Sequence, residues 1–338
     1  MKLKNKIFII AEIGINHNGN ILLAKKLIRE AKKSGADAVK FQSYISNELV
    51  TENLSLANYQ KRGNKKNTKI LQILKKCELS QKNQINLYKY CKRLNINFIS
   101  SAFDIKSLKF LYKNLKLKTL KVPSGELTNL PYIVELAKSK KKIILSTGMS
   151  TNLEIEKTLK ILQKFGLSKK NITLLHCNTA YPTPMRDVNL SVLGKLREKF
   201  KVKVGYSDHT VGIEVALAAA ALGATVIEKH FTLNKNSKGP DHLASTEPKK
   251  FKTMVKLIRN IEIAQGISEK KATQSEKINM KFARKSIVAS KKIFKGKKFS
   301  TKNITTKRPG NGISPMMWFK VLKMKSKKNF KKDELIKI

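Results

Sequence analysis

Eight short apolar segments, each followed by a segment of helical character, constrain the fold of this 338-residue chain more than any other feature. Strands that alternate with helices are typical of βα units on a parallel sheet. Eight such units within about 265 residues favour a closed (β/α)₈ barrel over an open doubly wound sheet. The predicted strands are residues 7–14, 38–44, 97–104, 119–126, 142–149, 172–182, 202–210 and 225–233.

The pattern also predicts how the chain is divided. The barrel is expected to span residues 1–267, with a polar loop and helical stretches at 45–96 that form a lid over its mouth. A polar, charged segment at 268–281 predicts a linker. The remaining residues, 282–338, are too few to form more than a marginal hydrophobic core. We therefore expect this small domain to pack against another surface.

The formal net charge of +48 raises the question of nucleic-acid binding. However, 63 of the 71 basic residues are lysines, whereas recognition of base edges favours arginine. The lysines are scattered over the predicted helix faces and no aromatic residues are interleaved with them, so we do not expect specific nucleic-acid binding. The sequence also has no G-x-G-x-x-G or G-x-x-x-x-G-K-[ST] motif that would indicate dinucleotide or P-loop chemistry.

Cysteine usage and hydropathy indicate the compartment. Cys77, Cys91 and Cys177 form no C-x-x-C pair, so neither a disulfide framework nor a zinc knuckle is indicated. The apolar run at 7–11 is too short for a signal peptide, and no stretch approaches the roughly 20 apolar residues that span a bilayer. We therefore expect a cytoplasmic protein with reduced thiols and no membrane partner.

Titratable residues gather at the carboxyl ends of the predicted strands, where barrel enzymes keep their catalytic groups. All five histidines and six of the 23 acidic residues lie at such an end or in the loop that follows it. This clustering predicts an active site at the mouth of the barrel. The residues are His17, His176, His209, His230, His242, Glu12, Asp104, Glu126, Asp208, Glu228 and Asp241.

His209 in GYSDHT and His230 in EKHFT close the last two predicted strands, which would be neighbours about 4.8 Å apart. Two imidazoles from adjacent strands can share one cation and leave positions open for water and substrate, as a Lewis-acid site requires. Nitrogen and oxygen ligands favour Mn²⁺, with Zn²⁺, Co²⁺ and Mg²⁺ as alternatives. The competing interpretation is that each histidine hydrogen-bonds locally in the barrel wall, which is how we interpret His176.

Lys40 and Lys121 are predicted to point into an otherwise apolar barrel, where an unpaired ammonium group is costly. A phosphorylated or carboxylated substrate would supply the missing anion, and serines at the same height could donate hydrogen bonds to it. The alternative is a Lys–Glu pair inside the barrel. Lys229 could likewise pair with Glu228 or face outward. The serines are Ser101, Ser124, Ser146 and Ser207.

With these residues assembled, the chain resembles the N-acetylneuraminate (sialic acid) synthase family. The matching segments, in order, are AEIGINHNG, ADAVKFQ, KVPSGE, ILSTGM, LLHCNTAYPTP, GYSDHT, IEKHFTL, GPDH and KRPGNGISP. The resemblance implies a (β/α)₈ TIM barrel joined to a C-terminal antifreeze-like (SAF) domain of the β-clip type. It also implies a domain-swapped homodimer, in which the small domain caps the partner's barrel.

The resemblance further implies a reaction and a set of site residues. The enzyme would be a C–C bond-forming transferase that condenses phosphoenolpyruvate with an N-acetylated amino sugar. His209 and His230 would hold a divalent metal, most often Mn²⁺, and Glu12 and Glu126 would lie near the reacting centre. Phosphoenolpyruvate would be bound by Lys40, Ser101, Lys121, Ser124, Ser146, Thr179 and Ser207. The amino sugar would be met by Gln42, Phe103, Tyr181, Asp241 and, from the other subunit, Arg308.

The identity of the sugar is the least determined of these expectations. We expect N-acetylmannosamine, which gives N-acetylneuraminate. The alternative is a 2,4-diacetamido-trideoxyhexose, which gives N,N'-diacetyllegionaminate or pseudaminate. The segment 58–68, which helps to select the sugar in the family, does not align with it, and Thr179 stands where some relatives carry Asn. A third hypothesis is a basic binding protein built on a barrel that has lost its activity.

Overall fold

The structure, a computed structural model of the chain, describes residues 6–56, 69–266 and 268–338. The chain forms two compact units, Met1–Gly266 and Ile267–Ile338, and each is described by itself. The sugar-selecting segment 58–68 lies outside the described residues, so the expectation attached to it stays a prediction.

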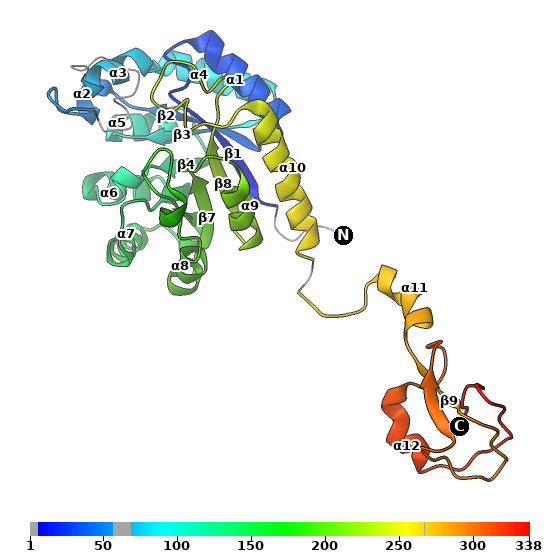
Figure 1. The fold of residues 1–338 in the computed structure, drawn as a ribbon. Coiled ribbons are helices and arrows are strands. Elements are labelled where there is room, and N and C mark those ends of the chain that lie inside the picture. The colour runs from blue at the N-terminus through cyan, green and yellow to red at the C-terminus, as the bar shows by residue number, and fades with distance from the viewer. Residues whose placement is uncertain (1–5, 57–68, 267) are drawn as a thin grey trace. The chain divides into compact units, whose positions relative to one another are not determined.

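The first unit is a closed barrel of eight parallel strands in sequential order, in which β1 pairs with both β2 and β8 (Figure 1). This confirms the predicted (β/α)₈ fold, and every predicted strand overlaps an observed one. Except for β1, the observed strands end earlier than predicted, so several candidate site residues lie in the loops just beyond them. The strands are β1 Phe8–Gly14, β2 Ala38–Ser43, β3 Asn97–Ala102, β4 Thr119–Val122, β5 Lys142–Ser146, β6 Ile172–His176, β7 Lys203–Asp208 and β8 Val226–His230.

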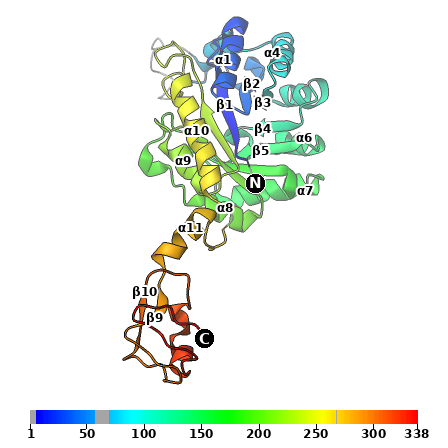
Figure 2. The same cartoon turned by 90° about the vertical axis from the view of Figure 1, so that its right-hand side faces the viewer.

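Helices follow every strand and surround the barrel (Figure 1). The last of these helices, α10 (Pro248–Ala264), packs beside α9 (Glu214–Ala221) and α1 (Ile21–Lys33) (Figure 2). Within its described residues, the predicted lid segment 45–96 contains the helices α2, α3 and α4. The other helices are α1 Ile21–Lys33, α2 Ser46–Leu49, α3 Ile70–Cys77, α4 Gln81–Arg93, α5 Ile105–Lys109, α6 Leu130–Lys138, α7 Asn152–Lys164, α8 Val192–Phe200 and α9 Glu214–Ala221. Among the described residues, no helix has both the length and the apolar character needed to cross a membrane.

The interior of the barrel has an apolar layer at its lower end and a polar layer above it. Because side chains alternate along a strand, residues two positions apart share a face. The buried Ile10 and Ala38 therefore lie one step below Glu12 and Lys40. Apolar side chains fill the lower layer, and the buried charged side chains of Glu12 and Lys40 lie above it, towards the carboxyl ends of the strands. The lower layer consists of Ile10, Ala38, Ile99, Ile144, Leu175 and Val226.

Gly205 allows β7 to approach β8 closely. A Cβ atom at this position would lie 2.4 Å from the carbonyl oxygen of Val226 and 2.7 Å from Cδ2 of Leu175. Only glycine avoids both clashes. The two strands that carry His209 and His230 are thereby held in the register that pairs Ser207 with Glu228.

The second unit contains a two-stranded antiparallel sheet of β9, Ser286–Ala289, and β10, Ile304–Lys307. Its small core includes Ile287, Phe299 and Phe330, and α12, Trp318–Leu322, packs against it. Helix α11, Gln274–Ala283, occupies much of the segment that we predicted as a linker. A capping box of Thr273 and Glu276 begins this helix, a T-x-x-E signal that the composition of the segment obscured.

Candidate active site

His209 and His230 lie side by side at the carboxyl ends of β7 and β8. Their ring centroids are 5.4 Å apart, with an angle of 65° between the ring planes. Nδ1 of His209 is 2.5 Å from the carbonyl oxygen of Asn178, so this nitrogen carries the proton and Nε2 keeps its lone pair. Nδ1 of His230 is buried and has no hydrogen-bond partner among the described residues. Tyr181 stacks on His209 at 4.2 Å and meets His230 edge-on at 5.6 Å.

Both imidazoles are neutral at physiological pH. Burial lowers the pKa of His209 to about 4. Burial also lowers the pKa of His230 well below its usual value, and the neighbouring His209 and Lys40 lower it further. Neutral imidazole is the form that binds metal ions.

A divalent ion fits between these two side chains. Two histidines on one ion have ring centroids about 5 Å apart, because each metal–nitrogen bond is about 2.1 Å long. The observed separation of 5.4 Å and the unpartnered nitrogen of His230 meet this requirement. Across the described ranges, no three His, Cys, Asp or Glu side chains gather as a metal site. A site with two protein ligands would leave positions open for water and substrate, as a Lewis-acid site requires.

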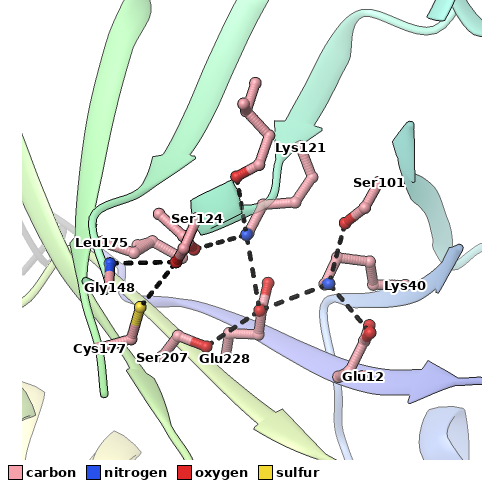
Figure 3. A network of polar contacts seen from close by, with 12 residues as sticks. Glu12, Lys40, Ser101, Lys121, Ser124, Gly148, Leu175, Cys177, Ser207 and Glu228 are labelled. Atoms are coloured by element: carbon pink, nitrogen blue, oxygen red, sulfur yellow. Dashed lines mark hydrogen bonds and ion pairs between the residues drawn. The ribbon is translucent and has the colours of Figure 1, made fainter. Parts of the chain in front are cut away.

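Two lysines and two glutamates form a buried network inside the barrel (Figure 3). Nζ of Lys40 lies 3.0 Å from Oε1 of Glu12 and 3.5 Å from Oε1 of Glu228. Nζ of Lys121 lies 3.8 Å from the same Glu228 oxygen. All four side chains are almost completely buried. The alternative of a Lys–Glu pair inside the barrel is therefore the arrangement observed, with Glu228 between the two lysines.

Figure 3 shows three of the predicted serines, Ser101, Ser124 and Ser207, around this network. Lys40 donates to Oγ of Ser101 at 3.1 Å, and Lys121 donates to Oγ of Ser146 at 2.6 Å. Ser207 donates to Oε1 of Glu228 at 3.0 Å. The structure thus brings together the groups that the sequence predicted for an anionic substrate.

Burial and ion pairing shift the pKa values of the four side chains in this network in different directions. Burial alone would lower the pKa of Lys40, but the ion pairs with Glu12 and Glu228 raise it above its ordinary value. Burial lowers the pKa of Lys121. Burial would raise the pKa of Glu228, yet the two lysines hold it below its usual value. Burial raises the pKa of Glu12 to about 7, so this carboxyl group can exchange a proton near neutral pH.

Gly14 lies close to Glu12 and to two predicted sugar-binding residues, Gln42 and Asp241. A Cβ atom on Gly14 would lie 3.2 Å from Oε1 of Glu12 and 3.4 Å from both Oδ2 of Asp241 and Nε2 of Gln42. Oδ2 of Asp241 is also 4.0 Å from Nδ1 of His230, and burial raises the pKa of Asp241 to about 6. Gln42 therefore lies next to the buried network, and Asp241 lies near both Glu12 and His230.

Ser124 and Thr179 converge on Gly148 at the opposite side of the network. Oγ of Ser124 accepts a hydrogen bond of 3.0 Å from the backbone nitrogen of Gly148 and lies 3.4 Å from Sγ of Cys177. A Cβ atom on Gly148 would lie 2.8 Å from Cγ2 of Thr179 and 2.9 Å from Oγ of Ser124. The close approach of this backbone to both side chains requires glycine.

Other predicted residues make contacts of their own. Glu126 is half-buried in a 3₁₀ turn and accepts a 2.6 Å hydrogen bond from Asn129. Burial raises the pKa of Glu126. Phe103 meets Tyr44 edge-on at 6.3 Å, in an apolar cluster beneath α3. Arg308 lies in the second unit, where its Nε donates to the carbonyl oxygen of Ala283 at 3.1 Å, so its role in the site stays a prediction.

The other three histidines make local hydrogen bonds. Nε2 of His176 is 2.9 Å from the carbonyl oxygen of Val188, which agrees with a structural role. Nδ1 of His17 accepts from the backbone nitrogen of Gly19 at 3.0 Å. Nδ1 of His242 is 2.7 Å from Oγ1 of Thr232. Of the five histidines at strand ends, only the pair on β7 and β8 has the geometry of a shared cation site.

Comparison with known proteins identifies the family. The NeuB family model matches residues 27–270, and the SAF domain model matches residues 284–338. The chain belongs to the NeuB family. The second match confirms the predicted SAF domain at the carboxyl end of this NeuB-family chain.

Relatives of this NeuB-family chain cover nearly its whole length. It is 51% identical to the N,N'-diacetyllegionaminic acid synthase of Campylobacter jejuni, over 98% of this chain and 99% of that protein. The protein of the same name from Legionella pneumophila is 42% identical over 91% of this chain and 87% of its own length. The crystal structure of N-acetylneuraminic acid synthetase from Leptospira borgpetersenii has 34% identity and a TM-score of 0.73, covering 82% of this chain and 90% of that chain.

Glu228 has a role in this NeuB-family site that the sequence did not predict. It was included only among the acidic residues at the strand ends, whereas in the structure it contacts both lysines and Ser207. Its position two residues before His230, on the same face of β8, is the signal that could have indicated this role. Lys229 pairs with Asp208 at 2.6 Å and not with Glu228. Of the two alternatives for Lys229, the outward-facing one is therefore observed, because alternation along the strand sends this side chain to the outer face of the barrel.

Proposed function

We propose that this NeuB-family enzyme condenses phosphoenolpyruvate with the open-chain aldehyde of a 2,4-diacetamido-trideoxyhexose and water, giving N,N'-diacetyllegionaminate and phosphate. The observation that carries the proposal is the 51% identity with a synthase of that name over nearly the full length of both chains. Similarity to the N-acetylneuraminic acid synthetase structure is lower, at 34%. This difference favours the diacetamido sugar over N-acetylmannosamine, which we expected first.

The buried network suits phosphoenolpyruvate. Lys40 and Lys121 present two ammonium groups inside the barrel, and charge-assisted hydrogen bonds to phosphate and carboxylate oxygens are among the strongest that proteins make. An incoming anion would displace Glu12 and Glu228 as the partners of these lysines. The proposed phosphoenolpyruvate ligands are Lys40, Ser101, Lys121, Ser124, Ser146, Thr179 and Ser207.

His209 and His230 would hold the divalent ion, which we propose to be Mn²⁺, with Mg²⁺ or Co²⁺ as alternatives. When bound, such an ion supplies Lewis-acid polarisation of the aldehyde oxygen. On the sugar side, Gln42, Phe103, Asp241 and Tyr181 would orient the substrate. Tyr181 already covers both imidazoles, so it would limit the access of water to them.

The chemistry then requires a new carbon–carbon bond and the loss of phosphate. C3 of phosphoenolpyruvate attacks the aldehyde carbon, water adds to C2, and the tetrahedral intermediate releases phosphate. Glu12 lies within the network, 3.0 Å from Lys40, where its carboxyl group could orient this water and accept its proton. Glu126, at the mouth of the barrel, would act on the sugar side. Positioning of the two substrates would supply much of the rate enhancement.

A panel of sugars tests the proposed function. Purified full-length protein is incubated with Mn²⁺, phosphoenolpyruvate and one of three sugars, and released phosphate is measured. The sugars are the 2,4-diacetamido-trideoxyhexose that leads to legionaminate, its stereoisomer that leads to pseudaminate, and N-acetylmannosamine. We expect the first to give a kcat/KM at least about tenfold above the others, the discrimination that one well-placed polar group provides. Preference for another sugar would reassign the substrate, and no release with any of them would refute the condensation.

We further propose a domain-swapped homodimer, as the family resemblance implies, in which Arg308 of the partner subunit completes the sugar site. Arg308→Ala should then raise the KM of the sugar more than that of phosphoenolpyruvate. Mixing this variant with a His230→Ala variant should restore part of the activity, since one of the two mixed sites is intact. Absence of complementation in refolded mixtures would contradict the swap.

The free cysteines Cys77, Cys91 and Cys177 agree with the expected cytoplasmic location.

A further inference from the structure

The outer face of β7 and β8 carries a second buried ion pair, separate from the network inside the barrel. Asp208 and Lys229 are partners in the strand register and are 0% and 1% exposed. Nζ of Lys229 donates to Oδ2 of Asp208 at 2.6 Å and to the carbonyl oxygen of Thr210 at 3.0 Å. Oδ1 of Asp208 accepts from the backbone nitrogen of Thr210 at 2.9 Å and from its hydroxyl at 2.7 Å.

These four hydrogen bonds close around the turn that holds His209. The turn runs from Asp208 to Thr210, so both ends of the residue that carries the imidazole are fixed by the same carboxylate and ammonium groups. Lys229 is also the residue that precedes His230 on β8. The Asp208–Lys229 ion pair therefore connects the two backbone segments, at the ends of β7 and β8, that carry the imidazole side chains.

Global stability does not explain why charged residues occupy these positions. Moving two charges out of water costs several kcal/mol per ion, and apolar residues of similar size often give equal or greater stability. The pair also cannot bind the substrate anion, because it lies on the opposite face of the strands from Lys40 and Lys121. What it provides is a fixed direction for two neighbouring side chains.

We propose that the Asp208–Thr210–Lys229 hydrogen bonds are a positioning device for the metal site, which holds the imidazoles of His209 and His230 at the separation a shared divalent ion needs. The inference rests on the proposed metal role of these histidines. Loss of hydrogen bonds that orient the ligands of a metal ion typically changes metal affinity by about 10–100-fold. A carbonyl group completes the arrangement, because that of Asn178 fixes the ring of His209 through Nδ1.

The test is a Mn²⁺ titration of the metal-free full-length protein, with free Mn²⁺ followed by electron paramagnetic resonance. The main variant, Asp208→Asn/Lys229→Met, removes both charges together and leaves no unpaired buried ion. We expect its Kd for Mn²⁺ to rise about 10–100-fold. Thr210→Val removes only the hydroxyl donor and should raise the Kd by a smaller factor. This second variant keeps the proposal testable if the first one fails to fold.

The matched control is an equally short ion pair at the other end of the barrel. Arg259 donates to Asp37 at 2.6 Å beside the start of β1. Asp37→Asn/Arg259→Met should lower the unfolding midpoint in urea while leaving the Kd for Mn²⁺ within about twofold of the unaltered protein, because additivity holds for distant sites. A Kd equally unchanged in the Asp208→Asn/Lys229→Met and Thr210→Val variants would show that the pair is only structural.

A readout without metal separates this inference from the proposed function. With ¹⁵N-labelled histidine, the metal-free protein should give His209 signals of a single tautomer protonated at Nδ1. The Asp208→Asn/Lys229→Met variant should show averaged signals for this ring. If the unaltered protein binds no Mn²⁺, the proposed metal role fails together with this inference. If it binds Mn²⁺ and the variants bind it equally well, only the positioning role is refuted.

Discussion

Replacing either His209 or His230 with alanine is expected to lower kcat/KM at least about 10³-fold while the barrel remains folded. A Lewis acid contributes several kcal/mol to the transition state, and each 1.36 kcal/mol changes the rate about tenfold. With only two protein imidazoles available, loss of one leaves a single nitrogen ligand. Phosphate release measures the rate, and circular dichroism checks the fold.

His176→Ala is the matched control for this prediction. His176 ends the neighbouring strand β6, but its Nε2 faces the carbonyl oxygen of Val188. Its removal should reduce stability and leave turnover near the original value. Full activity in a chelator-treated His209→Ala/His230→Ala variant would refute the assignment of the metal ligands.

Lys40→Met is expected to lower kcat/KM for phosphoenolpyruvate about 10²-fold or more. The substitution removes a buried ammonium group that would bind the substrate anion, and hydrogen bonds to charged groups contribute about 1.5–3 kcal/mol each. It also leaves Glu12 without its 3.0 Å partner, so the pKa of Glu12 should rise further and its carboxyl group should retain a proton. Steady-state kinetics with varied phosphoenolpyruvate measures the effect.

Lys203→Met serves as the comparison for Lys40→Met. Lys203 begins β7 at the opposite end of the barrel and its side chain is exposed. The same loss of one positive charge from the +48 chain should change kcat/KM by less than about threefold, since salt screens exposed charges. Equal losses in the two variants would mean that Lys40 acts through the overall field of the protein and not at the site.

The barrel could be predicted from the sequence because its strands are local signals. Each of the eight apolar segments carries polar residues in its second half, and parallel strands put those ends on one rim. The same reasoning predicted that Lys40, His209 and His230 lie on that rim. These residues stand at equivalent heights on or just after β2, β7 and β8, so their place on one rim follows from strand order alone.

Other features depend on contacts that strand order does not determine. The role of Glu228 was not predicted because it depends on contacts with Lys40 and Lys121, from strands distant in the sequence. For Lys229 two alternatives stayed open, a pair with Glu228 or an outward orientation, since the apolar pattern does not determine which face of β8 it occupies. N-acetylmannosamine was the sugar predicted first, whereas the 51% identity favours the diacetamido sugar. We expect sugar selection to depend on loop side chains, and a loop has no periodicity from which to infer contacts.

Pulsed electron paramagnetic resonance on the full-length protein loaded with one equivalent of Mn²⁺ tests the central claim most directly. The account predicts hyperfine couplings from two imidazole nitrogens, reduced to one in His209→Ala and in His230→Ala. Added phosphoenolpyruvate should leave both nitrogens in place. A spectrum without imidazole couplings, or one that is unchanged in the double variant, would contradict the account.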